Sequence, residues 1–335
     1  MNRKKANILI LYSYSESYEK ERPHEMAAEI EVEEVAHGIG EALMNIGFTV
    51  DMVHILTSHN IKDAVVKFRP ELVFNLCEAL NGVASGETLA AQTLEDMDMK
   101  YTGSGPSTLK VALDKGETKE LLLSKGIPSP PFKVLQEGDG FEIGLGFPVI
   151  VKPLNEDGSI GISRESVVND EVTLERRIKY IHNLYNQPAI IESYIDGREF
   201  NVGILGNPGD EVVLPLAEMD FSDFPDEIVQ ICTYKAKWFK DCAEYKGSVP
   251  ICPAIILPEV EEKIKKVALD AYRTLGVRGY GRIDIRLGAD GLPYVIDVNP
   301  NPSISRESGL VRASSAAGFT YERLISKIVE CTFEK

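Results

Sequence analysis

The chain has 335 residues, which is enough for two or three domains that each bury a core of their own. Its hydrophobic fraction of 44% and charged fraction of 26% are those of an ordinary globular protein. The formal net charge of −16 argues against binding to nucleic acid or to anionic membrane surfaces, because both require concentrated Lys and Arg. An acidic protein that binds phosphate groups must therefore gather its few cations at one site.

Residues 6–12 form a short apolar run, which predicts a buried strand of a parallel sheet. The run is too short to cross a membrane, and no small-residue cleavage site follows it. The five cysteines include no C-x-x-C pair, so we expect free thiols in a reducing compartment rather than a zinc site. These observations predict a cytoplasmic protein.

Strand and helix patterns alternate through the first hundred residues. Apolar side chains at helical spacing predict a helix over residues 32–46, and residues 88–97 predict another. Residues 48–55 and 71–76 predict two further strands. This alternation predicts an α/β fold in which residues 1–108 form a Rossmann-like domain with a parallel sheet and right-handed connections.

A second region begins after a rigid segment rich in proline. Residues 107–125 predict one helix, which leads into Gly-Ile-Pro-Ser-Pro-Pro at residues 126–131, a sequence typical of the entry to a new domain. Residues 147–152 and 189–194 predict two strands, with a helix over residues 174–184 between them.

The last third of the chain is rich in predicted strands, so the C-terminal part has α+β character. We expect one of these strands at residues 212–216, and a helix over residues 260–275 that packs against the sheet. Residues 220–250 are polar with little periodicity. A segment of that length without regular structure predicts a functional loop or a lid.

Lys152 ends a predicted apolar strand and is followed by Pro153, so it is not a surface lysine within a helix. Gly158, Ser159 and Gly161 follow, and a loop of this kind lets backbone N–H groups turn inward around a phosphate. Neither a G-x-x-x-x-G-K-[ST] motif nor a G-x-G-x-x-G after the first strand is present. The lysine and the loop together predict a phosphate site; the alternative is a solvated lysine at a strand end.

Glu192 to Ile195 end the next predicted strand, and Glu199 follows after an Asp-Gly pair. Backbone groups at such a strand end can bind the edge of an adenine. A carboxylate a few residues later can accept hydrogen bonds from ribose hydroxyls. An ordinary Asp-Gly turn is the alternative interpretation.

Residues 279–287 and 293–302 predict a β-hairpin, with the Asp290-Gly291 pair as its turn. Side chains alternate between the two faces of a strand, which places Arg282, Asp284 and Arg286 on one face. Asp297 and Asn299 share a face of the returning strand.

If the turn sets Asp284 opposite Asp297, two carboxylates, an amide oxygen and a guanidinium meet on one patch. Two carboxylates this close repel each other unless a cation lies between them. A small set of hard oxygen ligands suits Mg²⁺, so the hairpin predicts a metal–nucleotide site.

The phosphate lysine, the glycine loop, the E-x-x-x-x-G-x-E hinge at residues 192–199 and the R-x-D…D-x-N hairpin occur in the order of the ATP-grasp fold. More closely, the chain resembles D-alanine–D-alanine ligases over about residues 70–330. The motifs that carry this resemblance are Tyr101-Thr-Gly-Ser-Gly-Pro-Ser-Thr-Leu109, Leu113-Asp-Lys115, Gly126-Ile-Pro-Ser-Pro130 and Asp297-Val-Asn-Pro-Asn-Pro302.

The resemblance implies an ATP-dependent carboxylate–amine ligase that joins two amino acids through an acyl phosphate and releases ADP and phosphate. It also implies three domains: a substrate domain over residues 1–108, a central ATP-grasp subdomain over 109–200 with the glycine loop and hinge, and a C-terminal one over 201–335 with the lid, metal and acceptor sites. Family members are commonly homodimers, so we expect one here.

The resemblance assigns a nucleotide site and a site for two Mg²⁺ ions, or Mn²⁺ in their place. The residues that it places at ATP are Lys115, Lys152, Gly158, Ser159, Glu192, Tyr194, Ile195 and Glu199. As metal ligands it implies Asp284, Asp297 and Asn299, from the same hairpin.

Three catalytic roles are implied as well. Arg282 would stabilise the acyl phosphate and the tetrahedral intermediate, Lys237 would be the lid lysine that reaches the γ-phosphate, and Ser159 lies in the loop over the phosphates. Ser308 and Gly309 lie where the family binds the second substrate's carboxylate, at a helix start.

Glu29 is the remaining substrate candidate. Residues 28–32, Ala-Glu-Ile-Glu-Val, resemble the family's A-E-x-E-V, so Glu29 would bind a substrate ammonium. The alternative is that Glu29 is one of several acids on a solvated helix face.

The sequence departs from the family pattern at a metal position, in the lid and on the substrate side. The family usually has Glu at the position of Asp297 and Tyr at that of Trp238, and its early glycine-rich motif with a histidine is missing at residues 75–82. Other functions therefore stay open: a related ligase for other amino acids or small peptides, a ligase with a carrier-protein thiol as acceptor, or an ATP-binding module without activity.

Overall fold

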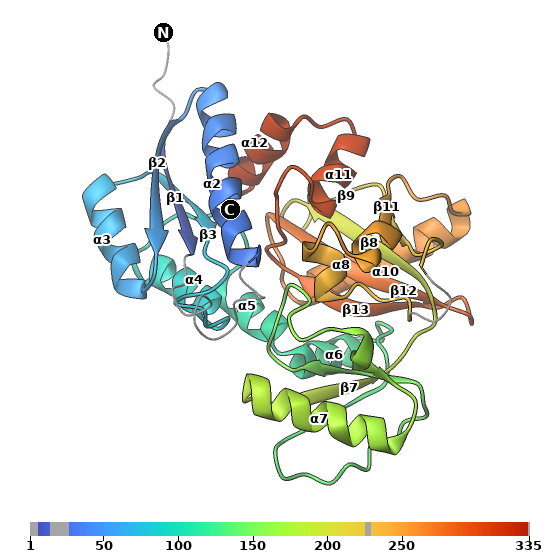
Figure 1. Cartoon of the computed structure of the whole chain (residues 1–335). Coiled ribbons are helices and arrows are strands. Elements are labelled where there is room, and N and C mark those ends of the chain that lie inside the picture. The colour runs from blue at the N-terminus through green and yellow to red at the C-terminus, as the bar shows by residue number, and fades with distance from the viewer. Residues whose placement is uncertain (1–5, 14–26, 225–228, 334–335) are drawn as a thin grey trace.

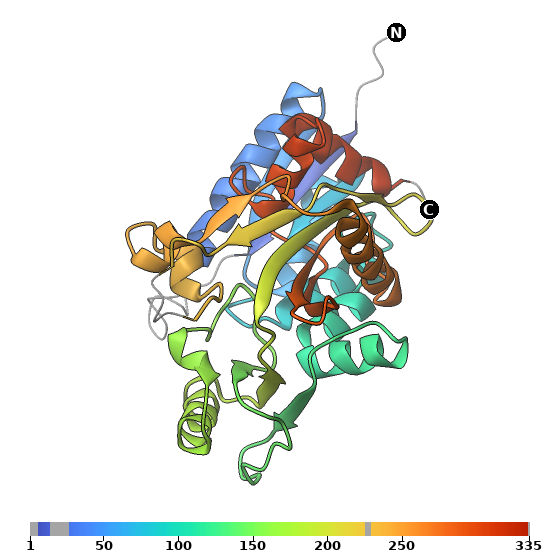
Figure 2. The ribbon, with the colours of Figure 1, turned by 90° about the vertical axis from the view of Figure 1, so that its right-hand side faces the viewer.

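The computed structural model describes residues 6–13, 27–224 and 229–333, and the side chains of 27–31 lie outside this description. The described residues form three separate sheets with helices packed around them (Figures 1 and 2). Within these ranges, no helix is both long and apolar enough to cross a membrane.

The N-terminal sheet has three parallel strands, with β1 (Asn7–Ser13) between β2 (Thr49–Ile55) and β3 (Leu72–Leu76). Every residue of β3 is buried, as expected for a parallel strand that is covered on both faces. The helices of this region are α2 (Ala27–Asn45), α3 (Ser58–Phe68) and α4 (Gly86–Asp96). The predicted parallel α/β sheet is confirmed.

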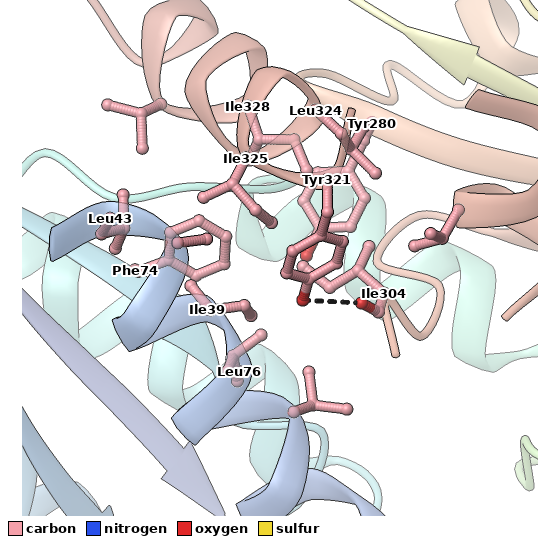
Figure 3. Close-up of a cluster of buried hydrophobic side chains, with 14 of the residues drawn as sticks. Ile39, Leu43, Phe74, Leu76, Tyr280, Ile304, Tyr321, Leu324, Ile325 and Ile328 are labelled. Carbon is pink, nitrogen blue, oxygen red and sulfur yellow. Dashed lines mark hydrogen bonds between the residues drawn. The ribbon is translucent and has the colours of Figure 1, made fainter. Parts of the chain in front are cut away.

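A hydrophobic cluster joins the two ends of the chain (Figure 3). Ile39 of α2 and Phe74 of β3 pack in one core with Leu324 and Ile325 of the last helix, α12 (Tyr321–Cys331). The Tyr321 hydroxyl donates to the Ile304 carbonyl oxygen at 3.0 Å, so this polar group is satisfied inside the cluster. The N-terminal sheet is thereby fixed against the C-terminal part of the chain.

The single helix predicted over residues 107–125 is wrong, because the structure has two helices, α5 (Pro106–Leu113) and α6 (Lys115–Ser124). Asp114 between them has an extended backbone, and its side chain accepts from the Glu117 N–H at 2.9 Å. An N-cap aspartate satisfies a helix-start donor and so favours a new helix at this point. Lys115 consequently begins α6.

The second sheet is antiparallel, with the strand order β4 (Phe132–Leu135), β7 (Ala189–Ser193), β5 (Val149–Pro153) and β6 (Val167–Val168). A short 3₁₀ helix, η2 (Arg164–Ser166), precedes β6. Leu174 and Ile178 of α7 (Glu171–Tyr185) pack against β5 and β7 in one core.

The third sheet has six strands and contains the predicted hairpin. Its main path is β11 (Val249–Ile251), β10 (Ala217–Asp220), β8 (Gly197–Leu205), β12 (Tyr280–Gly288) and β13 (Pro293–Asn299), and β9 (Val212–Val213) pairs with β8. Ile264 and Tyr272 of α10 (Pro258–Thr274) pack in a core with apolar residues of β8, β12 and β13.

The strand predicted over residues 212–216 is shorter than expected. Only Val212 and Val213 form β9, and Pro215 follows them two residues later. Proline has no N–H to donate to a strand ladder, which explains why the strand ends there. Pairing resumes at Ala217, in a different strand.

In the described part of the segment predicted to be irregular, residues 220–224 and 229–250, the structure has two five-residue helices, α8 (Tyr234–Trp238) and α9 (Ala243–Gly247). Thr233 caps the first through its side-chain oxygen, which accepts from the Ala236 N–H at 3.0 Å. We call residues 229–247 the lid segment. The eight-residue helix α11 (Gly309–Ala316) precedes α12.

Candidate active site

A cavity of about 1220 Å³ collects residues from all parts of the described chain. Glu34, Val35 and Gly38 of α2 line one side of it, and residues of the second and third sheets line the others. The predicted site residues along its wall are Lys152, Gly158, Ser159, Glu192, Tyr194, Ile195, Glu199, Lys237, Arg282, Asp284, Asp297, Asn299, Ser308 and Gly309. Site residues predicted from distant parts of the sequence therefore line one cavity.

The hairpin has the predicted register, with Asp284 paired to Asp297 and Arg282 to Asn299, and the register shifts after Asp284. Arg282 donates to Asp284 through two N–H groups, from Nε to Oδ1 at 2.7 Å and from Nη2 to Oδ2 at 2.8 Å. A two-point pair of this kind fixes both side chains in orientation as well as in distance.

Two amides complete the surroundings of Asp284. Asn201 Nδ2 donates to Oδ1 at 2.7 Å, and Asn299 Nδ2 donates to Oδ2 at 3.1 Å. Asn201 was not among the predicted site residues. Strand alternation could have found it, because it shares a face of β8 with Glu199 and pairs directly with Asp284.

Asp297 lies close to the ammonium group of Lys115 at the cavity. Its Oδ1 lies 3.8 Å from Lys115 Nζ, which also contacts Asp157 Oδ1 at 3.1 Å. Burial acts to raise the pKa of Asp297, but Lys115, Lys152 and the other nearby cations lower it below its usual value. Asp297 is therefore an ionised carboxylate at neutral pH, and its side chain remains 30% exposed.

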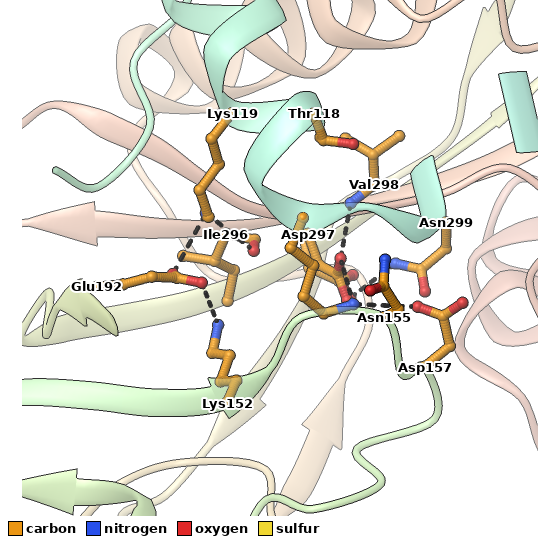
Figure 4. A network of polar contacts seen from close by, with 12 residues as sticks. Thr118, Lys119, Lys152, Asn155, Asp157, Glu192, Ile296, Asp297, Val298 and Asn299 are labelled. Carbon is orange, nitrogen blue, oxygen red and sulfur yellow. Dashed lines mark hydrogen bonds and ion pairs between the residues drawn. The ribbon is translucent and has the colours of Figure 1, made fainter. Parts of the chain in front are cut away.

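Glu192 lies between two buried lysines (Figure 4). Lys152 Nζ is 3.1 Å from its Oε1 and Lys119 Nζ is 3.2 Å from its Oε2, while the Glu192 side chain is 1% exposed. Burial acts to raise the pKa of Glu192, yet the two ammonium groups lower it. Lys119 was not among the predicted site residues; its ammonium also donates to Ser129 Oγ at 3.3 Å.

Because both Glu192 oxygens contact ammonium groups, replacing Glu192 by glutamine leaves two lysine charges buried without compensation. We expect the free energy of unfolding to fall by about 3–5 kcal/mol at pH 7. The folded pKa of Glu192 lies below the reference value of 4.5, so its contribution is complete above that value and is lost as the pH falls through the folded pKa. The stability difference from wild type should therefore narrow below about pH 4.5.

Urea unfolding at pH 7 and at about pH 3 measures both effects. The control is Glu175→Gln, which breaks an exposed pair with Lys179 and should cost less than about 1 kcal/mol. If Glu192→Gln and wild type had the same free energy of unfolding at pH 7, the two buried ion pairs would make no net contribution to the stability of the fold.

The glycine loop has left-handed backbone at successive residues, with φ of +62° at Gly158 and +64° at Ser159. The Ile160 N–H donates to the Asp157 carbonyl oxygen at 3.0 Å, which closes a tight turn. Positive φ at both central positions belongs to type I′ turns and is costly for a residue other than glycine, so Ser159 is held in this shape by the turn.

The lid segment contacts the glycine loop through Trp238, whose Nε1–H donates to the Gly158 carbonyl oxygen at 3.3 Å. Lys237 precedes it, and its Nζ lies 4.8 Å from the centre of the Trp238 indole ring. The predicted lid lysine and the predicted phosphate loop therefore lie side by side.

The predicted acceptor residues lie at the start of α11. Ser308 is the N-cap of this helix, and its Oγ accepts from the Val311 N–H at 3.4 Å. Gly309 is the first helical residue, and a Cβ there would meet only Asn201 Oδ1, at 4.0 Å. Glu29 lies in the first turns of α2, and its side chain is outside the described residues.

Comparison with known proteins supports one family. The family model "D-ala D-ala ligase C-terminus" matches residues 121–330. The chain is 34% identical over 259 residues to the uncharacterized protein y4sG of Sinorhizobium fredii, covering 77% of this chain and 74% of that protein. It is 32% identical over 254 residues to a D-alanine–D-alanine ligase of Cupriavidus pinatubonensis, covering 75% and 73%.

A D-alanine–D-alanine ligase of Bacillus anthracis, solved in complex with ATP, superimposes with a TM-score of 0.77 at 20% identity over 98% of both chains. This likeness shows that the fold is the predicted ATP-grasp fold with its N-terminal parallel-sheet domain. Because the family model covers more than half of the chain and a ligase relative is 32% identical, the chain belongs to the D-alanine–D-alanine ligase family, a family of ATP-dependent ligases that form a C–N bond.

Proposed function

We propose that this protein is an ATP-dependent carboxylate–amine ligase that joins two amino acids. The observation that carries the proposal is the meeting of Lys152, Arg282, Asp284 and Asp297 around one cavity. A first carboxylate would attack the γ-phosphate of ATP and release ADP, and an amine would then displace phosphate from the acyl phosphate to form the amide.

Phosphoryl transfer needs positioning and charge neutralisation rather than covalent help from the protein. Lys115 and Lys152 would hold the ATP phosphates, and both are already orientated by acidic partners, Asp157 and Glu192. Arg282, held at two points by Asp284, would face the charge that develops on the acyl phosphate and the tetrahedral intermediate. Glu192 would then act at the nucleotide through Lys152 rather than through its own carboxylate.

The donor set of the hairpin fits Mg²⁺, which would neutralise phosphate charge when bound. Asp284 and Asp297 offer carboxylate oxygens and Asn299 an amide oxygen, and these are the hard ligands that Mg²⁺ prefers. Asp297 is ionised and faces the cavity, as a ligand must. We propose these three residues as the holders of two Mg²⁺ ions, or of Mn²⁺ in their place.

The lid segment would exclude water from the acyl phosphate, with Lys237 at the γ-phosphate and Ser159 in the loop above it. Ser308 and Gly309 would bind the carboxylate of the second amino acid at the start of α11, where helix N–H groups favour an anion. Glu29 would bind the ammonium group of the first amino acid.

The division into domains at residues 1–108, 109–200 and 201–335 is part of this proposal. The three sheets support it, because the first lies within residues 1–108, the second within 109–200, and the third within 201–335 apart from the first residues of β8, which begins at Gly197. A homodimer located in the cytoplasm completes the proposal.

Phosphate release from ATP, measured with D- and L-amino acids singly and in pairs and followed by product masses, tests the function. Stimulation by D-alanine alone, with a product of the mass of its dipeptide, is the result expected of a strict D-alanine–D-alanine ligase. Turnover only with other amino acids or small peptides would indicate a related ligase. No stimulation by any of them would contradict the proposal and favour a thiol acceptor or an inactive ATP-binding module.

A further inference from the structure

A buried guanidinium, that of Arg286, lies in the wall of the cavity, next to Glu199. It follows Asp284 by two residues on the same face of β12, and its side chain is 4% exposed. Its Nε and Nη2 donate to Glu199 Oε2 at 3.1 and 2.9 Å. A buried cation is costly unless its N–H groups are satisfied, so partners decide where this side chain lies.

Two backbone carbonyl oxygens accept further hydrogen bonds from the Arg286 guanidinium. Nη1 donates to the Ile195 oxygen at 3.0 Å, and Nη2 donates to the oxygen of Gln230, at the beginning of the lid segment. The guanidinium carbon also lies 5.1 Å from the centre of the Tyr194 ring, and the Tyr194 hydroxyl donates to the same Gln230 oxygen at 3.2 Å. One side chain thus contacts the hinge, β8 and the lid segment.

We propose that Arg286 is a positioning residue of the nucleotide site. It holds the Glu199 carboxylate for the ribose hydroxyls and the Ile195 backbone for the adenine edge, and it fastens the base of the lid segment to the hinge. This inference rests on the proposed function, since it assumes that ATP occupies the cavity with its adenine at residues 194–195.

The contacts explain why arginine rather than lysine stands at this position. A guanidinium presents five N–H groups in a planar fork and can serve three acceptors in different directions. A lysine ammonium can keep the ion pair with Glu199, but it cannot also reach the Ile195 and Gln230 oxygens. Both Arg286 contacts to Glu199 go to Oε2, which leaves Oε1 to accept from a ligand hydroxyl.

The variant Arg286→Lys tests the inference, with ADP binding measured by calorimetry and ATP turnover by steady-state kinetics. We expect the Kd for ADP and the KM for ATP to rise at least tenfold. At saturating ATP, kcat should stay within threefold of wild type, because Arg282 and Lys152 are unchanged. Arg286→Gln, which also loses the charge, is measured in parallel and should weaken ADP binding further.

Arg198→Lys is the matched control, because Arg198 makes the same kinds of contact outside the cavity. It donates to both oxygens of Glu218 at 2.5 and 2.6 Å and to the Ile255 carbonyl at 2.8 Å, and it stacks on Phe200 at 5.1 Å. We expect Arg198→Lys to leave the Kd for ADP unchanged, and its only effect to be a lower melting temperature.

Wild-type affinity for ADP in either folded Arg286 variant would overturn the inference. So would a loss of melting temperature in Arg286→Lys equal to that of the control, with KM unchanged. Failure of the wild-type protein to bind ADP has a different meaning, because it would overturn the proposed function itself.

Discussion

Replacing Arg282 by alanine is expected to lower kcat by about 10²–10³-fold while the protein still folds and binds ADP. Among the residues that the structure describes, Arg282 is the one cation paired with Asp284, so its removal takes the positive charge away from this part of the cavity wall. Asp284 would stay in place in the variant, because Asn201 and Asn299 continue to donate to it. Steady-state phosphate release measures the effect.

Arg273→Ala is the control for this prediction. Arg273 donates to Glu211 at two points, 2.7 and 2.9 Å, just as Arg282 does to Asp284, but it lies on α10 away from the cavity. Its removal should leave kcat unchanged. An Arg282→Ala enzyme that works within tenfold of wild type would contradict the role given to Arg282.

The second large loss of activity is expected for Asp297→Asn, a substitution that keeps the shape of the side chain and removes its charge. We expect kcat to fall by about two orders of magnitude, as for the loss of one preorganised charged group, and the Mg²⁺ concentration for half-maximal activity to rise. The physical reason is that a neutral amide is a weaker ligand and no longer balances Lys115, whose ammonium lies 3.8 Å from Oδ1. Titration of activity with MgCl₂ measures both.

Two further variants sharpen the prediction for Asp297. Asp297→Glu restores the residue that is usual in the family and should retain activity within about tenfold, because the charge remains. Asp290→Asn changes an exposed carboxylate in the turn of the same hairpin, which accepts from Leu292 N–H at 3.0 Å, and should have no effect on the Mg²⁺ dependence. An Asp297→Asn enzyme with the Mg²⁺ dependence of wild type would remove Asp297 from the metal site.

Local patterns in the sequence were sufficient to predict the N-terminal sheet and the hairpin. Apolar runs and period-two alternation depend on a few neighbouring residues, and the Asp290-Gly291 turn fixes the register that sets Asp284 opposite Asp297. The family resemblance then placed the nucleotide and metal residues around one site. The structure brings these residues to the wall of one cavity, except Lys115, which does not line it and lies next to the lining residue Asp297.

Contacts between distant segments could not be predicted in this way. Lys119 and Glu192 form an ion pair although 73 positions separate them in the sequence (192 minus 119). No local sequence pattern around either residue predicts this contact. The break between α5 and α6 depends on one capping side chain, Asp114, inside a region whose apolar spacing continues as a helix. Pro215 was visible, and giving it more weight would have corrected the strand predicted at residues 212–216.

The contact between Trp238 and the Gly158 carbonyl makes the intrinsic fluorescence of this chain a probe of the glycine loop. Trp238 is the single tryptophan of the sequence, so indole fluorescence reports on one place only. Its Nε1 lies 3.3 Å from the Gly158 carbonyl oxygen in the loop proposed to cover the phosphates. Occupation of that loop, or separation of the lid segment from it, would change the polarity around one known ring, and could be followed in real time without attaching a dye.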